Sequence, residues 1–156
     1  MRHLVLDTPL GPLLLASDGE ALTAATFDGT PPATSRPESD AVLEAVARDL
    51  EAYFEGEPVT FSVPLRLDGT PFQEQVWAAL SQIPHGETIS YGTLAGRVGK
   101  PLGAQAVGAA NGANPAAVVV PCHRVIGADG SLVGYAGGLE RKRALLDLES
   151  RQRSLF

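Results

Sequence analysis

The chain of 156 residues contains a single cysteine, three histidines and few aromatic residues, which make up 6% of it. One cysteine forms no disulfide within the chain and supplies no thiolate zinc site. The histidines, His3, His85 and His123, do not stand at the spacing of metal ligands. We therefore expect no disulfide, no metal and no other cofactor. The lone Cys122 is then either an inert core residue or a reactive nucleophile.

Long apolar runs are also missing. No run approaches the roughly 20 residues that a membrane helix needs. The N-terminal segment contains Asp7 and Pro9, which come too early for a secretory signal. These features predict a cytoplasmic protein that does not bind membranes. Hydrophobic residues still make up 44% of the chain, enough to form a packed core in one domain or in two small lobes.

The net charge of −6 is unevenly distributed along the chain. Residues 1–84 contain 4 Arg and 13 Asp or Glu, whereas residues 85–143 contain 6 Lys or Arg and 3 acidic residues. The first segment therefore carries a net charge of −9 and the second a net charge of +3. This asymmetry predicts two lobes, the second of which can face the phosphates of a nucleic acid.

The order of predicted elements indicates an α+β fold. The first lobe, residues 1–68, is expected to be rich in strands, with a small antiparallel sheet over residues 4–27. A helix that ends at Gly56 should follow, because its apolar residues recur at helical spacing and Ser39 or Asp40 can cap it. A final extended segment completes this lobe.

The second lobe, residues 69–156, is expected to be mainly helical. Its first helix begins after Thr70, a plausible cap, and ends before Pro84. Further helices are expected over 88–99, 104–112 and about 139–149. The two short helices over 88–112 surround a turn rich in Gly and Pro within the basic half of the chain. This arrangement suggests a helix-turn-helix, which is a motif of DNA-binding proteins.

The sharpest chemical feature is the sequence Pro121-Cys122-His123-Arg124. It places a thiol, an imidazole and a guanidinium side by side, directly after five consecutive apolar residues. Burial raises the pKa of a thiol, whereas a neighbouring imidazole or guanidinium lowers it. Cys122 is therefore a candidate nucleophile, although a Cys–His pair alone is more often part of a core.

The sequence VVVPCHRVIG resembles the acceptor site of the O6-alkylguanine-DNA alkyltransferases. Proteins of this family repair DNA by moving an alkyl group from a damaged base onto their own cysteine. The resemblance covers nearly the whole second lobe, in order and spacing: TPFQEQVWAALSQIPHGETISYGTLA, AVGAANGANP, GYAGGLERKRALL and Glu149. The first lobe resembles the family only in outline.

The resemblance implies a role for each residue of the site. Cys122 would accept the alkyl group, His123 would take the thiol proton through a water molecule, and Glu149 would orient that imidazole. Tyr91 would press on the target phosphate and donate a hydrogen bond to the base, and Asn114 would brace the cysteine turn. The other pocket residues would be Val125, Tyr135, Ala136 and Gly137.

The resemblance also implies that the partner is double-stranded DNA with alkylated bases, bound by a monomer without an obligate protein partner. Gly108 and the alanines beside it, such as Ala106, would let a helix backbone approach a groove closely. Where the family usually has an arginine that fills the space of the extruded base, this chain has Gln105, with no charge and less stacking surface. Phosphate contacts are expected from Arg97, Lys100 and Arg124.

Two other functions fit part of the pattern. A cysteine hydrolase would also use a thiolate, an imidazole and a carboxylate. However, adjacent Cys and His side chains point in different directions, which disfavours direct proton exchange between them. A non-catalytic helix-turn-helix regulator would bind DNA without reacting. Cys122 argues against this second alternative, because relatives of the family that only bind damage lack the cysteine.

Overall fold

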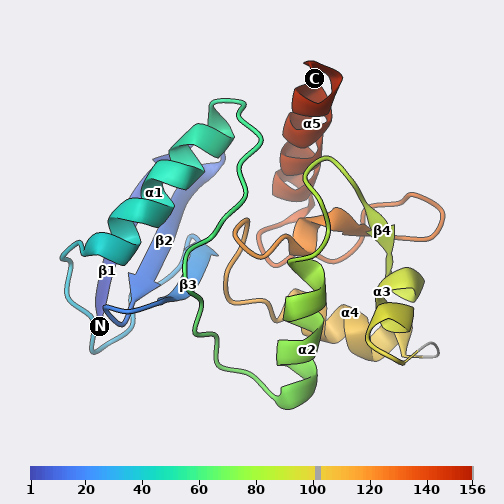
Figure 1. Cartoon of the computed structure of the whole chain (residues 1–156), viewed down its shortest axis with the longest axis horizontal. Helices are drawn as coiled ribbons and strands as arrows, with labels where there is room; N and C mark the ends of the chain where they lie inside the picture. The colour runs from blue at the N-terminus through green and yellow to red at the C-terminus, as the bar shows by residue number, and fades with distance from the viewer. Residues whose placement is uncertain (101–102, 156) are drawn as a thin grey trace. The chain divides into compact units, whose positions relative to one another are not determined.

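The structure is a computed structural model that describes residues 1–100 and 103–155, with side chains to residue 150. Its contacts divide the chain into two units (Figure 1). Unit 1 consists of Met1–Asp68 and Pro115–Val119, and unit 2 consists of Gly69–Asn114 and Val120–Phe156. A sheet of three strands characterises the first unit and helices the second, so the predicted α+β fold class is confirmed.

Unit 1 is built on an antiparallel sheet with the strand order β1-β2-β3. Its strands are β1 (Arg2–Thr8), β2 (Gly11–Ser17) and β3 (Leu22–Phe27). The central strand is buried from Leu13 to Ser17. Helix α1 (Ala41–Phe54) packs against β1 and β2 (Figure 1). The Asp40 side chain accepts a hydrogen bond from Leu43 N at 2.8 Å, so of the two predicted caps Asp40 is used.

Strand β3 also pairs with two segments outside the sheet. Leu22 donates to Pro64 O at 2.8 Å and accepts from Arg66 N at 3.0 Å, which fixes the predicted extended segment. Further along the strand, Ala25 N donates to Pro115 O at 2.8 Å, and Ala117 N donates to Ala25 O at 2.9 Å. The sequence analysis predicted that residues 115–119 belong to the second lobe, residues 69–156. These backbone hydrogen bonds place them in the first unit instead.

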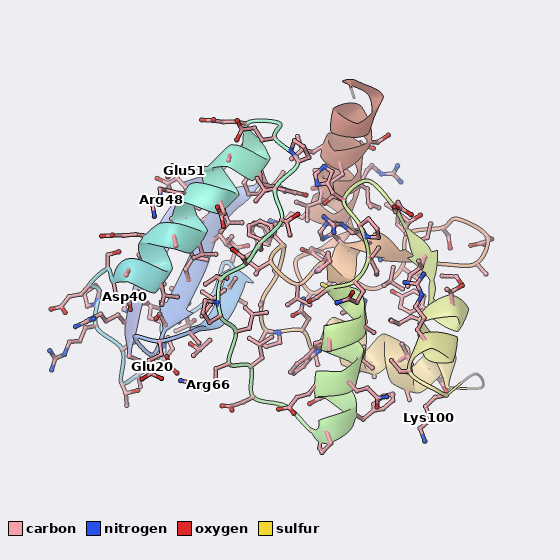
Figure 2. The ribbon with its side chains drawn as sticks, in the orientation of Figure 1. Glu20, Asp40, Arg48, Glu51, Arg66 and Lys100 are labelled. Atoms are coloured by element: carbon pink, nitrogen blue, oxygen red, sulfur yellow. The ribbon has the colours of Figure 1, made fainter. Side chains whose placement is uncertain are left out.

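The first unit carries its charged side chains on the surface. Arg66 pairs there with Asp18 and Glu20, and Figure 2 shows Arg66 beside Glu20. The charged groups of Arg66 and Asp18 lie in solvent, which screens the attraction between them. The pairing therefore adds little to the free energy of unfolding.

Unit 2 contains four α-helices in its described part. They are α2 (Pro71–Leu80), α3 (Tyr91–Arg97), α4 (Ala104–Gly112) and α5 (Leu139–Leu155). The predicted cap of α2 is confirmed, because Thr70 and Gln73 bond each other's backbone N–H groups at 3.1 and 2.9 Å. Helix α2 ends earlier than expected, at Leu80, and α5 continues beyond residue 149.

Helices α2, α3 and α4 pack against one another. Trp77 on α2 donates from Nε1 to Ala110 O on α4 at 2.9 Å. Gly99 follows α3 with φ +75°, the left-handed conformation that commonly ends a helix. Residues 101–102 of the predicted turn between α3 and α4 lie outside the described residues.

A short parallel pair was not predicted. Strand β4 (Ile89–Ser90) pairs with β5 (Val125–Ile126). Residues 89–90 therefore precede α3 as a strand, and Ser90 caps the helix by accepting from Thr93 N at 3.0 Å. Among the residues that the structure describes, no helix is both long and apolar enough to cross a membrane.

Candidate active site

Cys122 lies at the start of a single 3₁₀ turn, Cys122–Arg124, which leads into β5. It is the chain's free cysteine, and it is buried. Burial raises the pKa of the Cys122 thiol, while a hydrogen bond from Asn114 and the charge of Lys142 oppose this shift. At neutral pH the group is therefore a thiol, and a nucleophilic role requires a base that removes its proton.

His123 and Glu149 form a buried pair. His123 Nε2 lies 2.6 Å from Glu149 Oε2, and both side chains are almost fully buried. Burial lowers the pKa of His123, although Glu149 opposes this effect. The imidazole is therefore neutral near pH 7. Nε2–H donates to the carboxylate, which leaves Nδ1 as the proton acceptor.

His123 Nδ1 is buried and has no hydrogen-bond partner among the described residues. A buried nitrogen with a free lone pair is unfavourable unless water or a substrate group can occupy the position beside it. The pair thus has the chemical form of a general base, a neutral imidazole held by a carboxylate.

Glu149 is held by several donors. Arg124 donates to it from Nε at 2.8 Å and from Nη2 at 3.1 Å, and Gly86 N donates at 3.3 Å. Burial alone would raise the pKa of Glu149. The hydrogen bonds from His123 and Arg124 and the positive charge of Arg124 outweigh that effect and hold the pKa well below its usual range. The carboxylate is therefore ionised and fixed in place.

The prediction that Arg124 contacts phosphate is wrong. Its side chain is buried, and Nη1 donates to Ile83 O at 2.7 Å while the rest of the guanidinium binds Glu149. Arg124 therefore ties the 3₁₀ turn to α5 and to the loop after α2. The positive charge of Arg124 therefore lies inside the protein, where it neutralises the buried Glu149 carboxylate.

Tyr91 and Lys142 converge on one backbone carbonyl. Tyr91 Oη donates to Val133 O at 2.9 Å, and Lys142 Nζ donates to the same oxygen at 2.7 Å. The ammonium lies 5.9 Å from the centre of the Tyr91 ring. Burial raises the pKa of Tyr91, and negative charge on Cys122 adds to the shift. Both side chains are thus electrostatically coupled to the thiol.

Lys142 was missed by the sequence analysis. Burial lowers its pKa, and the charge of Cys122 opposes this shift. A signal was present, since Lys142, Leu145 and Glu149 are spaced three and four residues apart on α5 and are all buried. A lysine on the buried face of a helix indicates either a satisfied polar contact or a functional charge.

Two asparagines brace the cysteine turn. Asn114 Nδ2 donates to Val120 O at 2.8 Å, and Asn111 Nδ2 lies 3.4 Å from Cys122 O. Asn114 was predicted for this position, whereas Asn111 was not. Asn111 is buried in α4, and its spacing from the cysteine carries no sequence signal. Both amides act on the backbone on either side of Pro121.

The other predicted pocket residues lie in different environments. Val125 is buried in β5, and the Tyr135 hydroxyl is buried without a hydrogen-bond partner in the described chain. Burial raises the pKa of Tyr135, and Cys122 contributes to the shift. Gly137 accepts from Arg141 Nη1 at 3.2 Å, and Ala136 is exposed.

The predicted DNA-binding residues other than Arg124 lie on or near α3 and α4. Arg97 and Lys100 are exposed and pair with none of the described carboxylates, and Lys100 points away from the unit in Figure 2. On α4, Gln105 and Ala106 are exposed. A Cβ added at Gly108 would lie 3.7 Å from the Tyr91 ring, an ordinary contact.

Among the described residues, no three His, Cys, Asp or Glu side chains cluster so that they could hold a metal ion. The site instead combines a buried thiol, a neutral imidazole, an ionised carboxylate and a buried ammonium. In this set the imidazole can remove the thiol proton and the ammonium can stabilise the resulting thiolate. This is the chemistry of a cysteine nucleophile.

Comparisons with known proteins cover both units. Residues 71–151 match the model of the 6-O-methylguanine DNA methyltransferase DNA binding domain, and residues 1–67 match that of its ribonuclease-like domain. The methylated-DNA–protein-cysteine methyltransferase of Mycobacterium leprae is 52% identical in an alignment that covers 94% of this chain and 91% of the relative. The protein of the same name from Methanosarcina acetivorans is 46% identical, covering 96% of this chain and 98% of the relative.

The fold matches as well as the sequence does. The crystal structure of Mycobacterium tuberculosis OGT in complex with DNA superposes with a TM-score of 0.92 at 48% identity, covering 97% of this chain and 94% of that one. Sequence and fold agree along both units, and this chain therefore belongs to the 6-O-methylguanine DNA methyltransferase family.

Proposed function

We propose that this protein repairs alkylated DNA by transferring an alkyl group from O6 of guanine to Cys122, irreversibly and in a single turnover. The observation that carries the proposal is the 2.6 Å contact between His123 and Glu149 beside a buried thiol. Membership of the family supports alkyl transfer as the reaction of this arrangement. O4-alkylthymine is a second candidate substrate.

The first step is proton transfer. Neutral His123 takes the proton of the Cys122 thiol at Nδ1, with a water molecule between the two groups. Glu149 accepts from Nε2–H and stabilises the imidazolium that forms. The thiolate is stabilised by the amide of Asn114 and the ammonium of Lys142. A thiol that is protonated at rest does not react with other electrophiles until this relay acts.

The second step is in-line displacement at the alkyl carbon. A sulfur–carbon bond forms at Cys122 while the bond between that carbon and O6 breaks, and the electron pair leaves with guanine. Guanine is released once a proton is delivered to the base. We propose that Tyr91, whose hydroxyl donates to Val133 O in this structure, turns to donate to the base. The thioether product has no leaving group that water displaces readily, so the protein reacts once.

Base extrusion explains how a buried thiol meets a base of duplex DNA. A base inside the duplex cannot present O6 to a buried sulfur, so the nucleotide must rotate out of the stack. We propose that α3 and α4 bind the duplex, with Arg97 and Lys100 on phosphates and the small side chains near Gly108 at the groove. Gln105 would occupy the space of the extruded base. This assignment is supported by the exposure of Arg97, Lys100 and Gln105 and by the DNA-bound relative.

We further propose that the protein acts as a monomer in the cytoplasm, without an obligate protein partner. The thiol, its base and the carboxylate all come from unit 2 of one chain. Sedimentation of the protein with and without a short duplex tests the monomer. A dimer in the absence of DNA would contradict it.

The mass of the intact protein tests the proposed function. The protein is mixed with excess duplex that contains one O6-methylguanine, and we expect one methyl group per protein molecule and no further turnover. A cysteine hydrolase or a DNA-binding regulator would stay unmodified. Cys122→Ser is the control, because a serine hydroxyl is not ionised near pH 7. This variant should bind the duplex and gain no mass.

A further inference from the structure

The segment that leads into Cys122 has an unusual backbone. Val118 has a φ of +70°, and Val119 N donates to Ala117 O at 2.8 Å. These three residues form a γ-turn of the rare form whose central residue is left-handed. Among the described non-glycine residues, Asp28 alone shares a positive φ. Aspartate tolerates this region far better than a β-branched residue such as valine, so the turn at Val118 is strained.

A second three-residue turn separates Val118 from the thiol. Cys122 N donates to Val120 O at 2.8 Å, and Pro121 has φ −81° and ψ +64°, the common and unstrained γ-turn. The cysteine then opens the 3₁₀ turn. Two successive turns therefore connect Val118 to Cys122, with no strand or long helix between them. A change of φ at Val118 would shift the sulfur directly.

The strained turn is held on both sides. Toward the N-terminus, Ala25 of β3 bonds Pro115 O at 2.8 Å and Ala117 N at 2.9 Å. Toward the C-terminus, the Asn114 amide holds Val120 O at 2.8 Å. The Val118 side chain is itself buried, at 1% exposure. Strain of this kind persists where the surroundings fix the backbone, and it is concentrated at functional sites.

We propose that Val118 is a positioning residue for alkyl transfer. Its left-handed turn, which the γ-turn at Pro121 connects to the cysteine, sets the place of Cys122 Sγ relative to the alkyl carbon. This inference rests on the proposed function, because it takes Cys122 as the acceptor. Displacement needs sulfur, carbon and O6 in line, so a small shift of sulfur lowers the rate strongly.

Two substitutions separate the backbone of Val118 from its side chain. Val118→Gly and Val118→Ala both remove the buried isopropyl group, but only glycine holds a positive φ without a steric penalty. The glycine variant should transfer methyl within about twofold of the natural rate constant. The alanine variant should be roughly fivefold to thirtyfold slower, the population ratio expected for an L-residue in the left-handed region.

Val119 provides the matched control. It is the next residue in the chain, it is buried, and its φ is not positive. Glycine at this position adds backbone freedom and relieves no strain. We therefore expect the order to reverse, with Val119→Ala faster than Val119→Gly.

The rate constants are measured in a single turnover with excess duplex that contains O6-methylguanine, below the onset of thermal unfolding. Only the molecules that accept methyl are counted. A residue with a purely structural role would change the active fraction or the Tm and leave the rate constant of the remaining molecules unchanged. Equal rate constants for the two Val118 variants, or a faster alanine variant, would overturn the proposal.

Two controls keep the outcome decisive. If Val118→Ala does not fold, the glycine variants decide, since the proposal requires the natural rate constant for Val118→Gly and a lower one for Val119→Gly. The natural protein is measured in parallel. If it gains no methyl group, the proposed function fails whatever the variants do. If it does gain one, the order of the variants tests the role of Val118 alone.

Discussion

Glu149→Ala should destabilise the protein strongly, because it leaves Arg124 buried without its partner. The carboxylate accepts two hydrogen bonds from Arg124, at 2.8 and 3.1 Å, and contacts His123 at 2.6 Å. Removing one member of a buried ion pair costs about 3–5 kcal/mol. For a chain of this size each kcal/mol lowers the Tm by about 2–4 °C. We therefore expect the Tm to fall by roughly 6–20 °C in a thermal unfolding experiment.

The pH dependence of this loss distinguishes charge from packing. The pKa of Glu149 in the folded protein lies below the ordinary 4.5. A carboxyl group with a lowered pKa stabilises the fold fully above its unfolded pKa, and this contribution is lost as the pH falls toward the folded pKa. The difference in Tm between the natural protein and Glu149→Ala should therefore narrow below about pH 4.5.

A double variant supplies the control for this prediction. Arg124→Met with Glu149→Leu removes both charges and keeps apolar volume, a change that is often neutral for a buried pair. It should recover most of the stability that Glu149→Ala loses. A fall in Tm of less than about 2 °C for Glu149→Ala, or a fall that does not change with pH, would refute the reasoning.

Three further predictions concern charge and DNA. Lys142→Met should raise the pKa of the Cys122 thiol and slow transfer about tenfold, the equivalent of one pKa unit; an unchanged pH profile of iodoacetamide labelling would contradict this. The slope of log K for duplex binding against log salt should correspond to roughly 2 to 5 phosphates at about −0.9 each. Arg97→Ala and Lys100→Ala should each reduce that slope by about 1, and an affinity independent of salt would contradict the proposed interface. Gln105→Arg should raise the transfer rate about fivefold on duplex, the effect of 1 kcal/mol, and less on single strands. An equal gain on both substrates would show that Gln105 does not occupy the space of the extruded base.

Local sequence signals predicted most of the secondary structure. The caps at Asp40 and Thr70 were readable because a short polar side chain stood before an apolar helical pattern. Pairing over a longer range was not readable. The two-residue pair of β4 with β5 is too short for an alternating pattern. Likewise, nothing in the run Ala116–Val120 indicated that this segment bonds to β3.

At the site, the sequence analysis named residues that the structure brings together, but it predicted the wrong environment for Arg124. Arg124 follows the cysteine and histidine directly, so its charge was assigned to the surface. The structure shows that it faces the carboxylate of a residue far along the chain. Lys142 and Asn111 were missed because their contacts, with Val133 O and Cys122 O, depend on how separate elements pack. The strain at Val118 has no sequence signal, since valine is a poor choice for a left-handed backbone.

The central claim, that Cys122 is the alkyl acceptor, is tested most directly by locating the alkyl group. The protein is treated with duplex that contains O6-methylguanine, digested, and its peptides are sequenced by mass spectrometry. We predict S-methylcysteine at Cys122, one per molecule, and no methylated peptide from Cys122→Ser. A methyl group on any other residue, or full transfer by the serine variant, would contradict the account.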